Sequence, residues 1–157
     1  MKKILLAYGA LVVVVIVLAF VKFNGTTFFS NFGNGATATI GTQKFNLEIA
    51  RDDKSRQIGL SNRKSLDLNK GMLFLFEKKG IYSFWMKRTL IPLDIIYIDN
   101  DKIVYIVKNA KPEKDVKGTL PIYTPTVQSD KVLEINGGLS DKYNFKNGDV
   151  VKITGVK

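Results

Sequence analysis

Short β-like runs separated by turn residues constrain the fold of this 157-residue chain more than any other feature. Each run is rich in β-branched, aliphatic or aromatic side chains, and glycine or asparagine pairs such as Gly137-Gly138 and Asn147-Gly148 separate several of them. In residues 44–50 polar and apolar side chains alternate, which is typical of a strand with one face in water. The pattern predicts a mainly β domain, either a small barrel or a sandwich. We expect strands at residues 36–40, 44–50, 71–76, 82–87, 93–98, 102–108, 131–136 and 149–153.

One short helix is expected within this β pattern, at residues 52–60. Asp52 or Asp53 can cap its first turn, because an aspartate side chain accepts hydrogen bonds from the free N–H groups of a helix start. Ile58 lies one and a half turns later and is expected to face the core. A second helical turn is expected at residues 139–142, and no internal repeat of useful length is present.

The N-terminus carries an uncharged apolar run, residues 4–21. As a helix this run would span roughly 27 Å, close to the hydrocarbon thickness of a bilayer. It is long for the core of a cleaved signal peptide and has no convincing small-x-small cleavage site, so we favour an uncleaved signal-anchor over a cleaved signal. We therefore assign residues 1–23 to a transmembrane segment.

The charges around the apolar run predict the orientation of the chain. Lys2, Lys3 and the N-terminal amine outnumber Lys22, so the positive-inside rule keeps the N-terminus cytoplasmic. Residues 24–35 are rich in Gly, Asn and Thr and are expected to be a flexible tether. Residues 36–157 then form an extracytoplasmic β domain, held at the cell membrane by a single pass and facing the periplasm or the cell surface.

Composition excludes several classes of function. The chain has no cysteine and no histidine, which rules out thiol nucleophiles, disulfides, histidine-based triads and zinc sites built on those residues. The formal net charge of +10 is spread along the chain and forms no basic arm, so nucleic acid is not an expected partner. We predict no metal and no cofactor. The partners that remain are the membrane itself and a polar or anionic ligand.

Three charged residues interrupt the apolar stretch 84–99, and they define the first candidate site. Strand alternation puts Trp85 and Lys87 on one face and Arg88 on the other, before the chain turns at Pro92. Lys87 and Asp94 then lie on either side of this turn, where they could face each other across a hairpin. The pair could be an ordinary surface ion pair, or it could line a pocket beside an aromatic wall.

Three further charged residues allow two readings each. Arg56 and Arg63 could bind a carboxylate or phosphate through parallel donors, or they could cap the helix and pair with neighbouring aspartates. Glu134 lies among apolar residues, so it is either a half-buried site carboxylate or the solvent-facing residue of an edge strand.

Five sequence blocks, taken together, resemble the family catalogued as domain of unknown function 192, a group of mostly secreted or membrane-anchored prokaryotic proteins. In order along residues 38–153 the blocks read RQIGLSNRKSL, GMLFLF, FWMKRTLIPLDIIYID, VLEINGG and NGDVV. The resemblance implies a compact, mainly β, barrel-like domain with one helix, usually behind a signal or anchor, and it implies no activity.

The resemblance also implies which positions matter. This chain has Ser61 and Arg88 where the family pattern usually has methionine and asparagine. The combination of charge and glycine at the matching positions favours a ligand pocket near Trp85. The matching positions are Arg56, Gly59, Arg63, Gly71, Trp85, Lys87, Thr89, Pro92, Asp94 and Glu134.

Three functions fit the sequence. The first is a noncatalytic binding or accessory module, tethered outside the cytoplasmic membrane, for a glycan, a cell-wall fragment or a peptide. The second is a hydrolase that uses Asp94 and Glu134 as acid and base, which requires the two carboxyl groups to face one site. The third is a structural partner in a membrane complex, which requires a broad exposed apolar patch.

Overall fold

The computed structural model describes residues 35–112, 114 and 118–156. The predicted transmembrane segment, residues 1–23, lies outside the described residues, and so does the predicted tether except for Gly35. Within the described ranges, neither helix has the length and apolar character needed to cross a bilayer.

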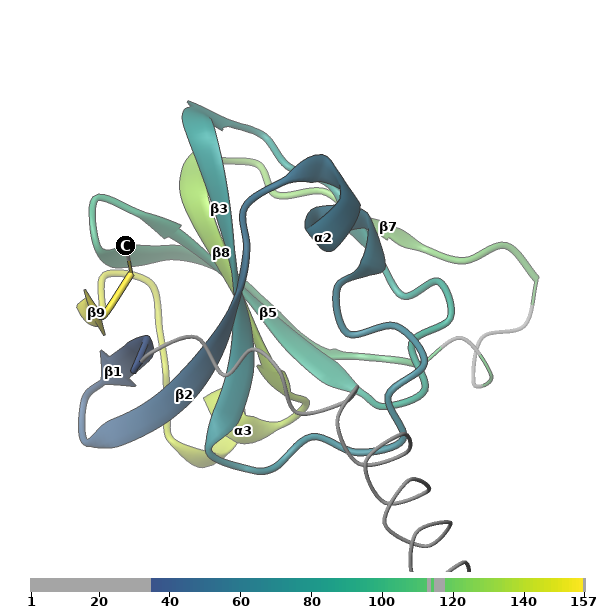
Figure 1. Ribbon diagram of the computed structural model, residues 1–157, viewed down its shortest axis with the longest axis horizontal. Coiled ribbons are helices and arrows are strands. Elements are labelled where there is room, and N and C mark those ends of the chain that lie inside the picture. The colour runs from purple at the N-terminus through teal and green to yellow at the C-terminus, as the bar shows by residue number, and fades with distance from the viewer. Residues whose placement is uncertain (1–34, 113, 115–117, 157) are drawn as a thin grey trace, which may run out of the picture. The chain divides into compact units, whose positions relative to one another are not determined.

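A curled sheet with barrel-like character forms most of the described domain (Figure 1). Its strands lie in the order β6-β5-β8-β3-β2-β1-β9, and a separate two-stranded sheet joins β4 to β7. The elements are β1 Thr37–Ile40, β2 Gln43–Ala50, α2 Asp53–Ile58, β3 Lys70–Gly80, β4 Phe84–Trp85, β5 Leu93–Asp99, β6 Lys102–Ala110, β7 Ile122–Tyr123, β8 Ser129–Asn136, α3 Leu139–Lys142 and β9 Val151–Thr154.

The connection through α2 explains the one parallel pairing found among the described strands. β2 runs parallel to β3, while the other pairs in the sheet are antiparallel. Parallel neighbours need a crossover connection, and α2 with its flanking loops supplies it. This crossover places α2 over one face of the sheet, on the same side as β7 (Figure 1).

The two ends of the sheet come close enough to give it its barrel-like curl. Lys102 at the start of β6 forms a bridge with Val150. The amide of Ile103 donates to the carbonyl of Asp149, and the amide of Val151 donates to the carbonyl of Asp101, both at 2.9 Å. These bonds tie β6 to β9 and close the curled sheet at that edge.

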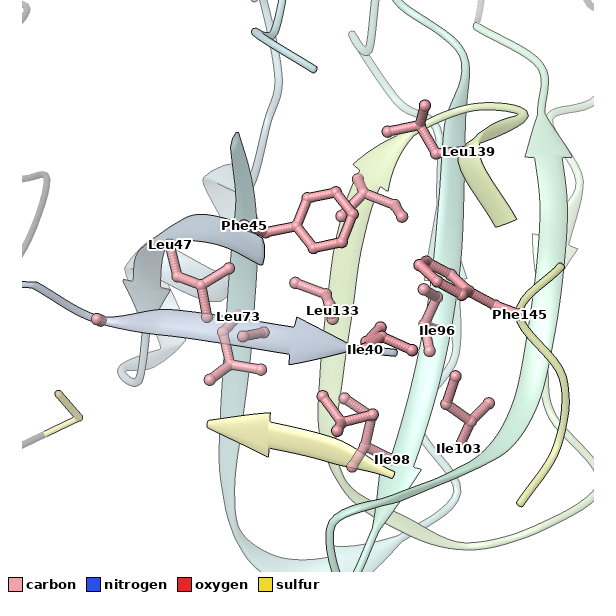
Figure 2. Packing of buried hydrophobic residues seen from close by; sticks show 14 residues of the cluster. Ile40, Phe45, Leu47, Leu73, Ile96, Ile98, Ile103, Leu133, Leu139 and Phe145 are labelled. Atoms are coloured by element: carbon pink, nitrogen blue, oxygen red, sulfur yellow. The ribbon is translucent and has the colours of Figure 1, made fainter. Parts of the chain in front are cut away.

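Strand alternation gives the sheet two buried faces. The barrel face, inside the curl, carries Ile40, Phe45, Leu73, Ile96 and Leu133, and Figure 2 shows these side chains packed together between β1 and the central strands. The second face carries Met72, Phe74, Ile95, Tyr97 and Val132, and Leu60, Met86 and Ile91 from the connecting segments cover it. We call it the groove face.

The predicted mainly β, barrel-like fold with one short helix is confirmed, and the expected strands correspond to β1–β6, β8 and β9. Asp52 caps α2 through a capping box with Ser55, and the second helical turn is α3. One detail of the helix was wrong. Ile58 is 53% exposed, and Leu60, beyond the helix end at Gly59, supplies the buried side chain instead.

A second expectation was also wrong, because β4 and β5 do not form a hairpin. β4 pairs with β7, whereas β5 pairs with β6 and β8. The two-residue strand β7 was not expected from the sequence. The segment after β4 covers the groove face with Met86 and Ile91, and β5 then enters the central sheet, where Asp94 points to the opposite face.

Candidate functional site

A groove between α2 and β4 brings most of the predicted site residues together. It has two connected parts that share Arg56, Phe74 and Trp85. The outer pocket, of about 280 Å³, is lined by Asp53, Arg56, Gln57, Phe74, Phe76, Tyr82, Ser83, Phe84 and Trp85. The inner pocket, of about 30 Å³, is lined by Arg56, Gln57, Ile58, Gly59, Leu60, Ser61, Phe74, Phe84, Trp85, Lys87, Thr89 and Glu134. We call the two parts together the α2–β4 groove.

Arg56 holds the helix wall of the groove against the sheet. Its Nη1 donates to the carbonyl oxygens of Arg51 at 2.6 Å and Leu75 at 2.9 Å, and its Nη2 contacts Asp53 at 2.6 Å. The guanidinium also lies over the ring of Phe76, 5.4 Å from its centroid. Because its guanidinium already donates to these three groups, the chief role of Arg56 is to hold α2 against β3.

Gly59 lets the chain pass close over the floor of the groove. Its φ of 49° and ψ of −134° suit glycine and are strained for other residues. A Cβ atom there would lie 3.3 Å from the Phe74 ring. The family glycine at this position therefore has a backbone role, and it sets the distance between the end of α2 and β3.

Two hydrogen bonds join the walls at the inner end of the groove. The Ser61 hydroxyl donates to the carbonyl of Lys87 at 3.2 Å, and the amide of Asn62 donates to the carbonyl of Arg88 at 2.8 Å. Arg88 has a φ of 56°, the left-handed region in which asparagine is the most tolerant residue after glycine. This conformation explains an asparagine in the family pattern without a ligand contact, and Arg88 does not line the groove.

Trp85 and Lys87 form the exposed wall opposite the helix. Trp85 is 54% exposed, and the Nζ atom of Lys87 lies 5.0 Å from its ring centroid. Lys87 has no carboxylate partner among the described residues. Across the small sheet, Trp85 pairs with Ile122, which is also exposed.

Glu134 provides the polar floor of the inner pocket. It lies in the central strand β8 between Met72 and Ile95 and is only 5% exposed, so it is not the solvent-facing residue of an edge strand. Its carboxyl group has no hydrogen-bond partner within the described part of the chain. Burial raises the pKa of Glu134 to about 8, although the charge of Arg63 acts in the opposite direction.

Arg63 is close enough to Glu134 to interact with its charge, but it does not line the groove. Its guanidinium binds both carboxylate oxygens of Glu48, with Nη2 at 2.6 Å from Oε2. The bidentate geometry orients the guanidinium and satisfies much of its charge locally. The sequence suggested pairing with neighbouring aspartates as one alternative for Arg63, but its partner is Glu48 on β2.

Thr89 is a second buried polar residue at the inner pocket. It is 5% exposed, and its amide donates to the carbonyl of Met86 at 3.0 Å. As with Glu134, the side chain has no hydrogen bond to any described residue. Two buried polar groups thus face a space that is large enough for about one water molecule.

Asp94 does not belong to this site, which corrects the predicted Lys87–Asp94 pair. Its side chain is fully buried on the barrel face, because its partner in β8 is Ile135 while Glu134 pairs with Ile95. Oδ1 accepts from the amides of Asn109 at 2.7 Å and Gly138 at 2.9 Å. Oδ2 accepts from the amide of Ser140 at 2.6 Å. The carboxylate therefore joins β6 and the start of α3 to β5.

The structure thus gathers five predicted residues and separates three. Arg56, Trp85, Lys87, Thr89 and Glu134 line the groove, whereas Arg63, Arg88 and Asp94 do not. The sequence reading missed the aromatic lining, which includes Phe76 and Tyr82 stacked at 3.5 Å between centroids. One feature of the sequence could have indicated this lining. In residues 71–76 both faces of the strand are apolar, so a second apolar layer must cover the face that does not point into the barrel.

A larger pocket of about 470 Å³ lies at one end of the barrel, beside the β1–β2 turn. It is lined by Ile40, Gly41, Thr42, Gln43, Tyr143, Phe145, Asp149 and Val150. Asp149 accepts a hydrogen bond from the amide of Lys146, so its carboxylate already has a structural role there. None of the predicted residues lies in this pocket.

The described residues also contain no group of three or more acidic side chains arranged to hold a metal ion.

Comparison with known proteins identifies the domain at the family level. Residues 36–153 match the family described as DUF192, uncharacterized ACR. A protein of unknown function from Novosphingobium aromaticivorans DSM 12444 is 34% identical, with a TM-score of 0.67 over 74% of this chain and 82% of that chain. A provisionally assigned transcription regulator from Sinorhizobium meliloti 1021 is 28% identical, with a TM-score of 0.68 over 77% and 93%. No curated protein matched the chain.

Proposed function

Because this chain belongs to the DUF192 family, which has no assigned activity, we propose its function from the α2–β4 groove. The domain is a noncatalytic binding or accessory module that takes a polar ligand in this groove. Residues 4–21 tether it to the cytoplasmic membrane, with the domain outside, as the flanking lysines favour. The ligand is a glycan, a cell-wall fragment or a peptide, and nucleic acid is not a partner.

Glu134 is the observation that carries the proposal. A buried carboxyl group without a partner destabilises a fold, and buried polar side chains normally have hydrogen bonds. Glu134 lies at the bottom of an opening lined by aromatic rings, with the exposed Trp85 and Lys87 at its edge. An apolar cleft with a few convergent polar groups and a perturbed pKa is the usual form of a ligand site.

The positions of Asp94 and Glu134 contradict the hydrolase hypothesis. Its two carboxylates must flank one bond, yet Asp94 and Glu134 lie on opposite faces of the sheet. Asp94 is also committed to three backbone amides. We therefore do not propose acid–base catalysis by this pair.

The structural-partner alternative requires a broad exposed apolar patch, and the described residues offer a smaller apolar strip. Trp85 and Ile122 face each other across the small sheet and are 54% and 66% exposed, and Ile58 is exposed on the helix wall of the same groove. This strip is narrow and borders the groove, so it suits an extended ligand that lies along β4 better than a broad protein contact.

Trp85 makes the proposal directly testable, because it is the one tryptophan in the sequence. Fragment 33–157 contains every described strand, and its fluorescence can be titrated with chito-oligosaccharides, wall muropeptides and short peptides. We expect a saturable change with at least one class. Lys87→Ala should weaken that binding about tenfold, since a charge-assisted contact at the groove edge is lost.

The matched control is Lys152→Ala, which removes an exposed lysine from β9, a strand that contributes nothing to the groove. It should leave the affinity unchanged. If no ligand class alters Trp85 fluorescence, or if both lysine variants bind equally well, the groove is not the binding site.

A further inference from the structure

We infer that the inner pocket binds the carboxylate of a small ligand, with the Glu134 carboxyl group as hydrogen-bond donor and the ligand's apolar part in the outer pocket. This inference rests on the proposed function and names the chemical class that the groove selects.

The unpartnered groups set the size and polarity of the ligand's end. Glu134 and Thr89 are both about nine-tenths buried or more, and both face a space of about 30 Å³. Such a space holds roughly one water molecule or the oxygen atoms of one terminal group. A carboxylate has two acceptor oxygens, one for the Glu134 proton and one for the Thr89 hydroxyl.

The charges around the pocket favour an anion over a cation. Arg56 on α2 is paired with Asp53, and Arg63 after α2 is paired with Glu48. Lys87 after β4 is left without a carboxylate partner among the described residues. An ammonium group would therefore meet uncompensated positive charge at the entrance.

The protonation of Glu134 agrees with a donor role. Burial raises its pKa to about 8, so the neutral carboxyl form predominates at pH 7. Other titratable groups lie on the same face of the sheet. Tyr97 on β5 has its pKa raised by burial, by the Glu134 charge and by Tyr105, so that it stays neutral as well. Glu48 on β2 is bound to Arg63. A neutral carboxyl group can donate to an oxyanion, whereas an ionised one would repel it.

The outer pocket specifies an apolar body next to the carboxylate. Phe76 is stacked on Tyr82, and Phe74 packs edge-on against Phe84 at 5.0 Å between centroids. These rings line the outer pocket together with Trp85. A flat or extended apolar group of a few carbon atoms would bury its surface against them.

Three matched probes test the inference on the full-length protein in a nonionic detergent. They are 3-phenylpropionate, its amide and 3-phenylpropylamine, each titrated against Trp85 fluorescence at pH 7. We expect the carboxylate to bind about tenfold more tightly than the amide, because a charge-assisted hydrogen bond replaces a neutral one. We expect the amine to bind most weakly. Equal binding of all three, or tightest binding of the amine, would overturn the carboxylate assignment.

The pH dependence and the Glu134 variants test the donor role. Carboxylate binding should weaken about tenfold between pH 7 and pH 9, as Glu134 ionises. Glu134→Gln keeps an N–H donor and cannot ionise, so it should bind without this pH dependence. Glu134→Ala should lose at least about tenfold in affinity. A loss as large in Glu134→Gln as in Glu134→Ala, or binding that strengthens with pH, would contradict a donor role.

A final set of probes distinguishes a peptide carboxylate from a sugar carboxylate. It also tests the carboxylate assignment separately from the proposed function of the groove. N-acetylphenylalanine represents a peptide C-terminus and glucuronate represents an acidic sugar, and saturable binding of either supports a carboxylate site. If neutral oligosaccharides or the amide probe bind while no carboxylate does, the carboxylate assignment fails and the groove remains the binding site. If no probe and no ligand class changes Trp85 fluorescence, the proposed function fails as well.

Discussion

Among the described residues, each face of the sheet has one buried carboxyl group, and the two groups differ in whether the fold supplies their hydrogen bonds. On the barrel face, Asp94 accepts hydrogen bonds from three backbone amides. On the groove face, Glu134 has no such bond among the described residues and lies at the bottom of a pocket. Burial alone does not make an acidic residue functional. What distinguishes the two groups is whether the fold supplies their hydrogen-bond donors.

The same contrast extends to the surroundings of each face. The barrel face is filled by side chains such as Phe45, Leu73 and Ile96 and is closed by β1, β9 and α3 (Figure 2). The groove face is covered by α2 and by the segments around β4 and β7, which pack less completely and leave the groove between them. Regular strand pairing fills most of the barrel face and leaves a pocket only at the barrel end near Ile40 and Phe145, while the irregular connections over the other face leave the α2–β4 groove.

Removal of the Asp94 carboxylate should have the largest effect on stability. Asp94→Ala leaves the buried amide of Ser140 and the partly buried amides of Asn109 and Gly138 without acceptors, and we expect a loss of about 4 kcal/mol in the free energy of unfolding. Urea denaturation of fragment 33–157 measures it. The matched control is Asp141→Ala, whose exposed pair with Lys108 should contribute less than about 1 kcal/mol. Similar losses of unfolding free energy in both variants would contradict the structural role of Asp94.

Glu134→Gln should have the opposite effect, which grows as the pH rises above 4.5. The pKa of Glu134 is raised from an ordinary value of 4.5 to about 8 in the folded state, so the folded protein holds this proton more tightly than the unfolded chain does. The wild-type protein is therefore expected to lose stability as pH rises from 4.5 through 8. Glu134→Gln should lack this loss and be more stable by about 3 kcal/mol at pH 7.

Urea denaturation of both proteins at pH 4.5, 7 and 9 checks this prediction. At pH 4.5 the two free energies of unfolding should agree within about 1 kcal/mol, since the wild-type side chain is then largely neutral. Parallel pH profiles for the two proteins would show that Glu134 is already ionised in the fold.

The smallest effect is expected from a double-mutant cycle between Asp94 and Lys87. Their side chains belong to opposite faces, so Asp94→Asn and Lys87→Gln should be additive within about 0.5 kcal/mol in the free energy of unfolding. Asparagine keeps the volume of Asp94, which helps the single variant to fold. A coupling energy above about 1 kcal/mol would indicate that Lys87 and Asp94 interact, as the sequence predicted.

Much of the fold could be predicted because its signals are local. Alternation in residues 44–50, the turn glycines and the Asp52 capping box each act within a few residues. β7 could not be predicted, because two residues form it and its pairing with β4 depends on a contact between distant segments. Ile58 was placed in the core by helical spacing, whereas a helix this short buries none of its side chains and Leu60 covers the sheet instead.

Several residues that line the groove could be named from the sequence, but their interaction partners could not. Arg56, Trp85, Lys87, Thr89 and Glu134 were recognisable from their charge or aromatic character and from the family pattern, and they line one groove. The error at Asp94 arose because two segments that follow each other in sequence were assumed to pair. Strand order decides which face a side chain meets, and the short runs in this sequence do not encode that order.

The neighbouring positions of β1 and β9 have one more consequence. The first and last strands pair along their length, so the two ends of the β domain leave it side by side, with Thr37 opposite Thr154. The lining of the groove contains no residue from either strand. Another sequence can therefore be fused at either end of the domain, or the domain can be inserted into a loop of another protein, without a change in its strand order or in the α2–β4 groove.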